Sequence, residues 1–421
     1  MRADPPDPET SEARRIAEPW MTAPATVAVM DALEAAGGPG SARFVGGCVR
    51  NAVLGLPVDD IDVATSLRPD EASSALRAAK LKVVPTGVEH GTVTAISGRK
   101  PFEITTLRRD VSTDGRRAVV AFTDDWTEDA RRRDFRLNSL YADRSGRLFD
   151  PTGHGVEDAL AGRIVFVGRA VERIAEDVLR ILRFFRFYAW FGRGEPDAEA
   201  LAACIEQRTS LASLSAERVQ KELLKLLQAV DPMPATRLMA RAGVLAEVLP
   251  GAGSLDRLAG LVALDRIEGR PPDALLRLAA LVAADRGDAA QTAGRLRLSN
   301  AQRERLLALA DEGPVPDPAM TLPGARRAIY ALGPQAFNDR LRLARAAAPA
   351  GQDAADWRAL EALAESWRPP PFPLSGADVM ARGVPEGPRV GEVLKALEAG
   401  WIEGDFTADR QALLDRLGAM S

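Results

Sequence analysis

Residues 43–65 read RFVGGCVRNAVLGLPVDDIDVAT and contain the pattern that determines the architecture of the first part of the chain. A short apolar run ends at Gly46 and Gly47, and the next residues, 49–54, have helical character. A Gly-x-Pro turn at 55–57 then leads into a second β-branched run. This order of strand, helix and strand predicts a mixed α/β unit whose turns are set by glycine and proline.

The glycine turn is a candidate phosphate site. Gly46 and Gly47 have no side chains, so their backbone amides can approach a ligand closely, and the N-terminus of the following helix favours an anion. Arg50, one helical turn further on, can add a charge-assisted hydrogen bond to the same phosphate. Taken alone, a Gly-Gly pair is more often an ordinary turn between a strand and a helix. The acidic pair that follows it favours a functional site.

Asp60 and Asp62 form the second half of this candidate site. Residues two apart in a strand face the same side, so these carboxylates point one way while Asp59 and Ile61 point the other. Two such carboxylates repel each other and favour a divalent cation between them; oxygen ligands suit Mg²⁺, with substrate phosphates completing its shell. Such a site supports in-line displacement at phosphorus. An isolated Asp-x-Asp is more often a strand end, but beside Gly-Gly-x-x-Arg it predicts a catalytic pair.

Runs that predict strands all lie before residue 150, whereas Ala, Leu and Arg dominate after residue 155 and predict helices. The predicted strands are 43–45, 60–64, 92–96, 102–107 and 119–122. Residues 88–96 and 102–107 predict a hairpin beside the acidic strand, in which Glu103 is either a third carboxylate of the site or a structural strand residue. The predicted fold class is α+β: a small mixed head with an antiparallel-type sheet and helices, followed by an elongated all-α neck, body and tail.

Composition restricts the classes of protein that the chain can be. Its 421 residues are 46% hydrophobic and 27% charged, a balance typical of a globular protein with a sizeable core. The 55 basic and 59 acidic residues give a formal charge of −4, so any nucleic-acid partner must meet a local basic patch. Two cysteines are too few for a disulfide framework, and two histidines exclude a His-rich zinc site. No apolar run approaches the roughly 20 residues that cross a bilayer, and we expect a cytoplasmic protein without membrane association.

The segments GGCVRN and LGLPVDDIDVAT resemble the signature of class II tRNA nucleotidyltransferases and bacterial poly(A) polymerases, within the DNA polymerase β superfamily. Most members of that family have Asp where this chain has Asn51. The resemblance implies a nucleotidyltransferase head in which Asp60 and Asp62 are catalytic and hold Mg²⁺. It also implies that the triphosphate is cradled by Gly46, Gly47, Arg50 and Arg133.

Residues 131–138, RRRDFRLN, resemble the RRDFTxNA motif of the same family. The segment gathers three guanidinium groups beside Asp134, with Asn138 four residues later, and on its own it is more often a solvated charged loop. By resemblance, Arg133 meets the triphosphate, while Asp134 and Asn138 help to hold the ribose end of the pocket. Arg136 replaces the usual threonine.

Residues 176–187, EDVLRILRFFRF, predict a helix that is apolar nearly all round and therefore buried. Asp177 and Arg180 are neighbours at i, i+3 on that helix, and Arg183 and Arg186 continue the spiral. Buried arginines need partners or a ligand, so the alternative is an internal salt-bridged structural helix. The stretch resembles the family's EDxxR motif, which implies that Asp177 and Arg180 select the base of CTP and then ATP. Arg183 and Arg186 then support the nucleotide and its phosphates.

Three further segments resemble parts of the family. Residues 214–227 resemble its neck helix, with Ser215 as the cap and a structural role. Residues 108–117 form a polar loop where the family has a flexible loop needed for terminal A addition. Residues 85–91 resemble the CCA-adding group and lack the basic motif typical of bacterial poly(A) polymerases.

The resemblance therefore implies an enzyme that adds CCA to the 3′ end of tRNA without a template, using CTP, ATP and Mg²⁺ and releasing pyrophosphate. The alternatives are a poly(A) polymerase, a partial enzyme that adds only CC or only A, and a catalytically silent RNA-binding protein. We infer no obligatory protein partner. The predicted parts are a disordered tail at 1–22, the catalytic head at 23–145, a neck with the base template at 146–230, an RNA-binding body at 231–370 and a tRNA-binding tail at 371–421.

Overall fold

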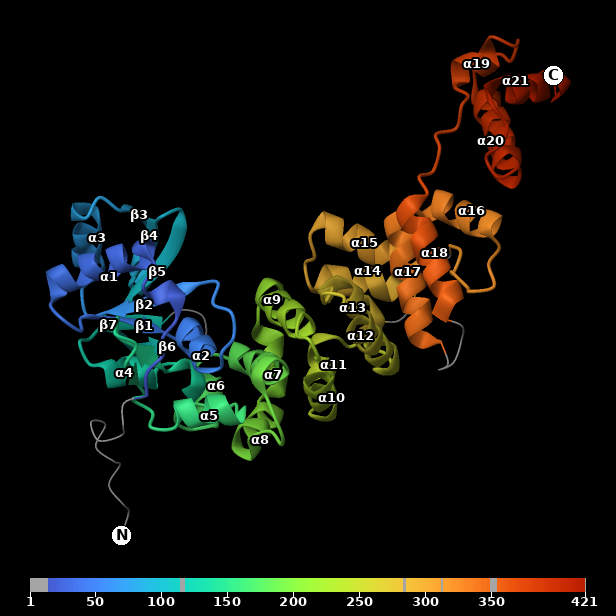
Figure 1. Cartoon of the computed structure of the whole chain (residues 1–421). Coiled ribbons are helices and arrows are strands. Elements are labelled where there is room, and N and C mark those ends of the chain that lie inside the picture. The colour runs from blue at the N-terminus through green and yellow to red at the C-terminus, as the bar shows by residue number, and fades with distance from the viewer. Residues whose placement is uncertain (1–13, 114–117, 283–284, 312, 349–353, 421) are drawn as a thin grey trace. The chain divides into compact units, whose positions relative to one another are not determined.

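The computed structural model describes residues 14–113, 118–282, 285–311, 313–348 and 354–420. Its contacts divide the chain into two units, Met1–Pro250 and Gly251–Ser421 (Figure 1). Within the described ranges, every strand belongs to the first unit and the second unit is helical. No helix in these ranges is long and apolar enough to cross a membrane.

Seven strands form the central sheet of the first unit. The strands of the unit are β1 (Ala42–Val45), β2 (Ile61–Thr65), β3 (Lys82–Gly87), β4 (Thr92–Ser97), β5 (Lys100–Thr106), β6 (Arg108–Thr113), β7 (Ala118–Phe122), β8 (Tyr141–Ala142) and β9 (Leu148–Phe149). The sheet has the order β3-β4-β5-β2-β1-β8-β9, while β6 and β7 pair separately. Its neighbours are antiparallel except β2 and β5, which are parallel and place Asp62 beside Glu103. This parallel pair brings an acidic residue from each of two strands to adjacent positions.

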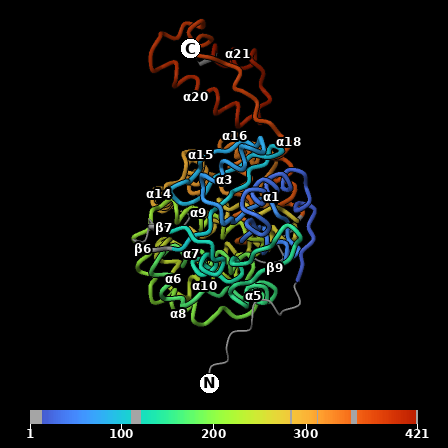
Figure 2. Tube along the Cα trace, turned by 90° about the vertical axis from the view of Figure 1, so that its left-hand side faces the viewer, coloured from blue at the N-terminus to red at the C-terminus, as the bar shows by residue number. Residues whose placement is uncertain are grey.

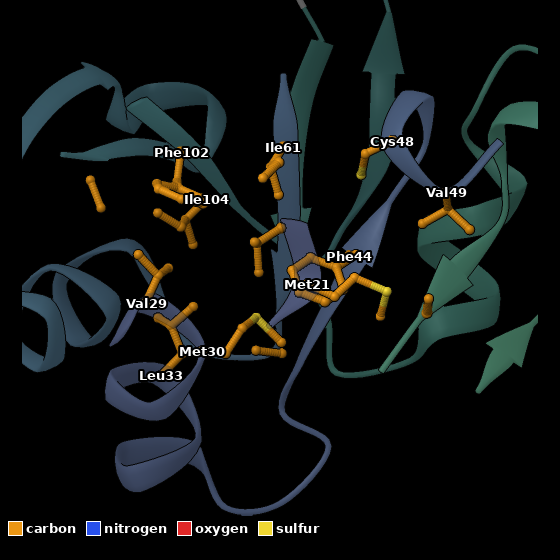
Figure 3. Packing of buried hydrophobic residues seen from close by; sticks show 14 of the residues in the cluster. Met21, Val29, Met30, Leu33, Phe44, Cys48, Val49, Ile61, Phe102 and Ile104 are labelled. Carbon is orange, nitrogen blue, oxygen red and sulfur yellow. The ribbon is translucent and has the colours of Figure 1, made fainter. Parts of the chain in front are cut away.

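Alternate residues of β2 face opposite sides of the sheet. Ile61 and Val63 join the main core of the head, which lies against α1 (Pro24–Gly37) and α3 (Pro69–Ala78) (Figure 3). These two helices lie side by side (Figure 1 and Figure 2). On the other side, Ala64 packs in a smaller cluster with Tyr141. Asp62 shares that second face, away from the main core.

The connection from β1 into α2 (Gly47–Val53) depends on Gly46. Its backbone has φ of +72°, a conformation that glycine adopts with little strain and other residues rarely adopt. Its amide donates to the carbonyl of Leu140 at 3.0 Å, which ties the turn to the chain just before β8. The predicted strand, helix and strand at 43–65 are therefore present, with Asp60 directly before the first residue of β2.

In the first unit, α4 (Trp126–Arg131) and a short 3-10 helix at Arg136–Asn138 precede β8, and the later helices follow β9. The α-helices after β9 are α5 (Gly155–Ala161), α6 (Ala170–Glu176), α7 (Leu179–Phe191), α8 (Ala198–Glu206), α9 (Ala216–Leu227), α10 (Met233–Arg241) and α11 (Val244–Val248). α7 packs against α9 and α10. Its aromatic side chains Phe184, Phe185 and Phe187 are buried, so the apolar surface predicted for 176–187 is covered by other helices.

The second unit consists of α12 (Asp256–Glu268), α13 (Ala274–Leu281), α14 (Arg286–Arg295), α15 (Asn300–Ala310), α16 (Leu322–Leu332), α17 (Pro334–Ala347), α18 (Ala354–Ser366), α19 (Gly376–Met380), α20 (Pro388–Glu403) and α21 (Arg410–Met420). A buried ion pair between Arg277 and Asp265, at 3.0 Å, joins α13 to α12. Trp401 lies in the core of the last three helices and meets Tyr330 of α16 edge-on, with ring centroids 5.9 Å apart. Aromatic packing therefore joins α16 to the C-terminal helices.

The predicted α+β class, with a mixed head followed by helices, is confirmed. Three local predictions are wrong. Residues 108–113 form β6 where a polar loop was expected, because pairing with β7 satisfies their backbone groups; residues 114–117 lie outside the described residues. In the predicted disordered tail, Ile16 and Met21 are buried in the head core, and residues 1–13 lie outside the described residues. Ser215 precedes α9 but makes no side-chain cap hydrogen bond.

Phe44 tests the head core, because it is fully buried in β1 and packs edge-on against Trp20 at a centroid distance of 4.9 Å. We expect Phe44→Ala to lower the unfolding free energy of the head by about 3–5 kcal/mol through lost burial and a cavity. The measurement is urea-dependent hydrogen exchange of peptides from β1 and β2. The control is Leu160→Ala, at a residue that is 47% exposed, and it should change the unfolding free energy by less than about 0.5 kcal/mol. Equal effects of the two substitutions would contradict the place of Phe44 in the core.

Candidate active site

The glycine turn and the segment 131–138 meet at one place in the head. A Cβ built on Gly46 would lie 3.6 Å from Nη1 of Arg133 and 3.8 Å from the carbonyl oxygen of Asn138. A Cβ on Gly47 would lie 3.8 Å from Nη2 of Arg50. Two guanidinium groups therefore border a stretch of backbone that has no side chains. This is the arrangement that a phosphate group can enter, with amide and guanidinium donors around it.

The predicted metal site consists of Asp60 and Asp62, and Glu103 is the residue left open as a third carboxylate. Asp60 is exposed and Asp62 is half-buried, and the exposed Glu103 is the register partner of Asp62 on β5. Burial raises the pKa of Asp62, and the negative charges of Glu103 and Asp60 raise it further, to about 6, against a lowering by Arg133. Within the described ranges no three His, Cys, Asp or Glu side chains gather closely enough to form a metal site by themselves. The acidic pair is present, and Glu103 acts on it through charge.

Arg133 is held in place by a buried acid that the sequence analysis did not single out. Asp129 of α4 accepts from Arg133 Nη2 at 3.0 Å and from Arg132 Nε at 2.8 Å. The hydroxyl of Tyr141 donates to the same carboxylate at 2.7 Å. Burial alone would raise the pKa of Asp129, but the two arginines and the tyrosine hold it well below its usual range. Asp129 is therefore an anion that fixes Arg133 beside the glycine turn.

Asp134 joins three parts of the first unit. Its carboxylate accepts from Arg183 Nε of α7 at 2.8 Å, from Asn138 Nδ2 at 3.1 Å and from the amide of Phe135 at 2.8 Å. Burial opposes its ionisation, but the charge of Arg183 and these hydrogen bonds lower its pKa to about 2. Asn138 in turn accepts from Arg50 Nη1 at 2.6 Å. Asp134 and Asn138, both predicted to hold the ribose, thus make their side-chain hydrogen bonds within the protein.

Arg183 and Arg186 share an acid on α9. Glu222 is buried, accepts from Arg186 Nε and lies 3.7 Å from Arg183 Nη1. The guanidinium of Arg186 also stacks over the ring of Phe187 at 4.3 Å. Hydrogen bonds and ion pairs therefore join Arg50, Arg183 and Arg186 through Asn138, Asp134 and Glu222. Arg133 is held separately, by Asp129 and Tyr141.

The two residues predicted to select the base are each paired within the protein. Arg218 of α9 donates to both oxygens of Asp177, at 2.9 and 2.7 Å. Arg180 Nη1 donates to Glu176 at 2.6 Å and to the carbonyl of Arg173 at 2.6 Å. Asp177 lies just before α7 and Arg180 in its first turn, where the amide of Arg180 donates to the carbonyl of Asp177 at 3.0 Å; the side chains of both residues bind other partners.

The acids Asp129 and Glu222 were not predicted from the sequence, and Arg218 was predicted only as part of the neck helix. Asp129 is four residues before Arg133, a spacing that pairs side chains on a helix and could have indicated it. Glu222 and Arg218 lie four residues apart on α9, and Glu222 is buried with the apolar residues of that helix. Their partners lie about forty residues earlier in the chain, so spacing alone does not identify them.

Comparisons with known proteins show which family and fold the chain resembles. The family model described as the poly A polymerase head domain matches residues 42–165, and the model described as the probable RNA and SrmB-binding site of polymerase A matches residues 195–255. The mitochondrial CCA tRNA nucleotidyltransferase 1 of Mus musculus is 33% identical over 88% of this chain and 85% of its own length. A CCA-adding enzyme of Latilactobacillus sakei is 30% identical over 92% of this chain and 95% of its own length. The crystal structure of the Bacillus stearothermophilus CCA-adding enzyme in complex with CTP superposes with a TM-score of 0.73 at 25% identity, covering 96% of this chain and 98% of that one.

The raised pKa of Asp62 gives a prediction about stability. Because its pKa is about 6 in the folded chain against an ordinary 3.8, its ionisation costs folding free energy, and this cost develops as pH rises from about 4 through 6. We expect metal-free Asp62→Asn to be more stable than the wild type at pH 7.5 by about 1 kcal/mol after solvent screening, and equally stable at pH 4. Urea unfolding with EDTA at both pH values measures this difference.

Asp59→Asn is the matched control for Asp62→Asn, because Asp59 is exposed and lies three residues earlier in the chain. Asp59→Asn removes the same charge, so a similar gain in unfolding free energy at pH 7.5 in that variant would show a general effect of net charge. A loss of stability in Asp62→Asn at pH 7.5 would contradict the electrostatic account of the site.

Proposed function

The chain belongs to the family of CCA-adding tRNA nucleotidyltransferases, and we propose that Asp60 and Asp62 are the catalytic carboxylates with which it adds CCA to the 3′ end of tRNA. The observation that carries this proposal is the position of Arg133. Its guanidinium borders the glycine turn at Gly46, and its charge acts on Asp62. A nucleotide whose triphosphate lies at the turn then has its α-phosphate near the acidic pair.

The proposed reaction is a single in-line displacement. The terminal 3′-hydroxyl of tRNA attacks the α-phosphorus of bound CTP or ATP, a phosphodiester bond forms, and the bond to pyrophosphate breaks. A divalent cation fits the acidic pair. The carboxylates of Asp60 and Asp62 repel each other, and a cation bound between them would relieve this repulsion. We propose Mg²⁺, which when bound favours loss of the hydroxyl proton and neutralises charge on the reacting phosphate. Asp60 and Asp62 hold it, and the arginines orient the triphosphate.

Gly46, Gly47, Arg50 and Arg133 are proposed to bind the triphosphate, with Arg183 and Arg186 adding positive charge. Asp134 and Asn138 are proposed to act by positioning these arginines. This role follows from their contacts, since Asp134 accepts from Arg183 and Asn138 accepts from Arg50. It replaces the direct ribose contact that the resemblance implies.

Base selection is proposed for Asp177 and Arg180. A carboxylate accepts from the exocyclic amine that CTP and ATP share, and a guanidinium donates to ring nitrogen or carbonyl acceptors. In this structure Asp177 accepts hydrogen bonds from Arg218, and Arg180 donates one to Glu176. A bound base must therefore exchange with or share these partners, and the energy of the exchange contributes to discrimination.

The helices beyond the head are proposed to bind tRNA, as the body at 231–370 and the tail at 371–421. Support for the first part of the body comes from the match of residues 195–255 to a model described as a probable RNA and SrmB-binding site. The cytoplasm is the proposed location; both cysteines are free thiols, as expected in a reducing compartment.

The test of function is single-turnover extension of tRNA transcripts that end before CCA, after C and after CC, with each nucleotide separately and with CTP plus ATP. We expect two C additions and then one A, with UTP and GTP refused. Asp60→Ala should slow both additions by about 10³-fold or more, because charge stabilisation at the reacting phosphate is lost. tRNA binding, measured by filter retention, should be unchanged.

Long A tails in this assay would identify a poly(A) polymerase, and a stop after CC, or addition of only A, a partial enzyme. Binding without extension would support a silent RNA-binding protein. Asp59→Asn, next to the acidic pair, should extend tRNA at the wild-type rate.

Arg180→Ala tests the proposed base selection. We expect the ratio of CTP to UTP incorporation to fall by about 10-fold or more, because a hydrogen bond from a charged group is worth about 1.5–3 kcal/mol. Competition between the two nucleotides in the extension assay measures the ratio. Unchanged discrimination would exclude Arg180 as a template residue. Arg169→Ala, at an exposed arginine that pairs with Glu172, is the control for removal of a helical ion pair.

A further inference from the structure

Arg50 differs from the other arginines of the site in the charge of its partners. Arg133 pairs with Asp129, Arg183 with Asp134, and Arg186 with Glu222. The hydrogen-bond partners of Arg50 among the described residues are two neutral amides instead. It donates from Nε and Nη2 to Asn51 Oδ1, at 3.1 and 2.7 Å, and from Nη1 to Asn138 Oδ1 at 2.6 Å.

The environment of Arg50 makes this unusual. Its side chain is only 8% exposed, and its guanidinium stacks over the ring of Phe191 at 4.1 Å. Burial lowers its pKa, and the positive charge of Arg186 lowers it further, to about 10. The acid whose charge acts on it most, Asp134, is already bound to Arg183. A buried cation without its own counter-ion destabilises the free protein, and an anion that reaches it gains the interaction.

Asn51 controls how this cation is presented. Its Nδ2 donates to the carbonyl of Pro57 at 2.8 Å, which leaves Oδ1 directed at Arg50. The bond fixes the amide between α2 and the segment that leads to Asp60. The guanidinium is thereby oriented beside Gly47, while its charge is left unneutralised.

We propose that Asn51 is a positioning residue that holds Arg50 by a neutral amide so that its full charge is available to a phosphate of the nucleotide. The proposal rests on the proposed function of the glycine turn as the triphosphate site. An aspartate at position 51 would have almost the same shape but would neutralise Arg50. It would also turn a carboxylate oxygen toward the carbonyl of Pro57, which cannot donate to it.

The experiment compares the full-length wild type, Asn51→Asp and Asn51→Ala in equilibrium binding of CTP and of inorganic tripolyphosphate at several KCl concentrations. We expect Asn51→Asp to bind both about 5- to 10-fold more weakly than the wild type at low salt, with the difference shrinking as salt screens the added charge. Asn51→Ala loses the positioning bonds but adds no charge, so it should lie between the other two at low salt. At high salt the affinities of Asn51→Asp and Asn51→Ala for both ligands should become equal.

Two results would overturn the proposal: wild-type affinity for tripolyphosphate in Asn51→Asp, or equal weakening in both variants at every salt concentration. Arg50→Gln keeps the proposal testable if Asn51→Asp does not fold, because removal of an uncompensated cation must weaken tripolyphosphate binding and its salt dependence. Asn300→Asp, at an exposed residue of α15, adds the same charge outside the head and should bind as the wild type does. Extension of tRNA by the wild type is measured in parallel, so failure of the enzyme function is seen separately from failure of the role of Asn51.

Discussion

The ion pair between Asp134 and Arg183 is the interaction on which the arrangement of the site depends. Asp134 belongs to the segment that follows α4, and Arg183 belongs to α7, so one buried contact joins the head sheet to the neck helices. Through Asn138 the same carboxylate reaches Arg50 and the glycine turn. Leaving either charge unpaired in this buried place would cost roughly 3–5 kcal/mol, so the segment after α4 and helix α7 are held in one relative position. That position determines which side chains border the glycine turn.

The triphosphate site that we propose places several cations close together, and these repel each other. This chain limits that repulsion by giving most of the arginines an acid of their own, including the buried acids Asp129 and Glu222. The acids also fix the guanidinium orientations, so less side-chain freedom is lost when a nucleotide binds. Arg50 is the exception, and its neutral partners leave more of the local charge for the ligand.

The acidic side of the site shows the same conflict between function and stability. Asp62 is placed by strand alternation on the face opposite the main core, and the parallel pairing of β2 with β5 adds Glu103 next to it. Neighbouring negative charge and burial make its ionised form unfavourable in the free chain. A cation reverses this effect. The same repulsion therefore favours a cation beside these carboxylates.

The sequence by itself determined the strand, glycine turn and helix at 43–65, the face of β2 on which Asp62 lies, and the helical character of the chain after residue 155. These features depend on local periodicity, on the backbone freedom of glycine and on helix propensity, all of which act between residues close in the chain. Only the tertiary structure decided that β2 and β5 run parallel, that 108–113 pairs as a strand, and that Arg218 binds Asp177. Each of these depends on partners brought together by packing. A buried charge takes whichever counter-ion the fold places beside it, and sequence spacing does not specify that choice.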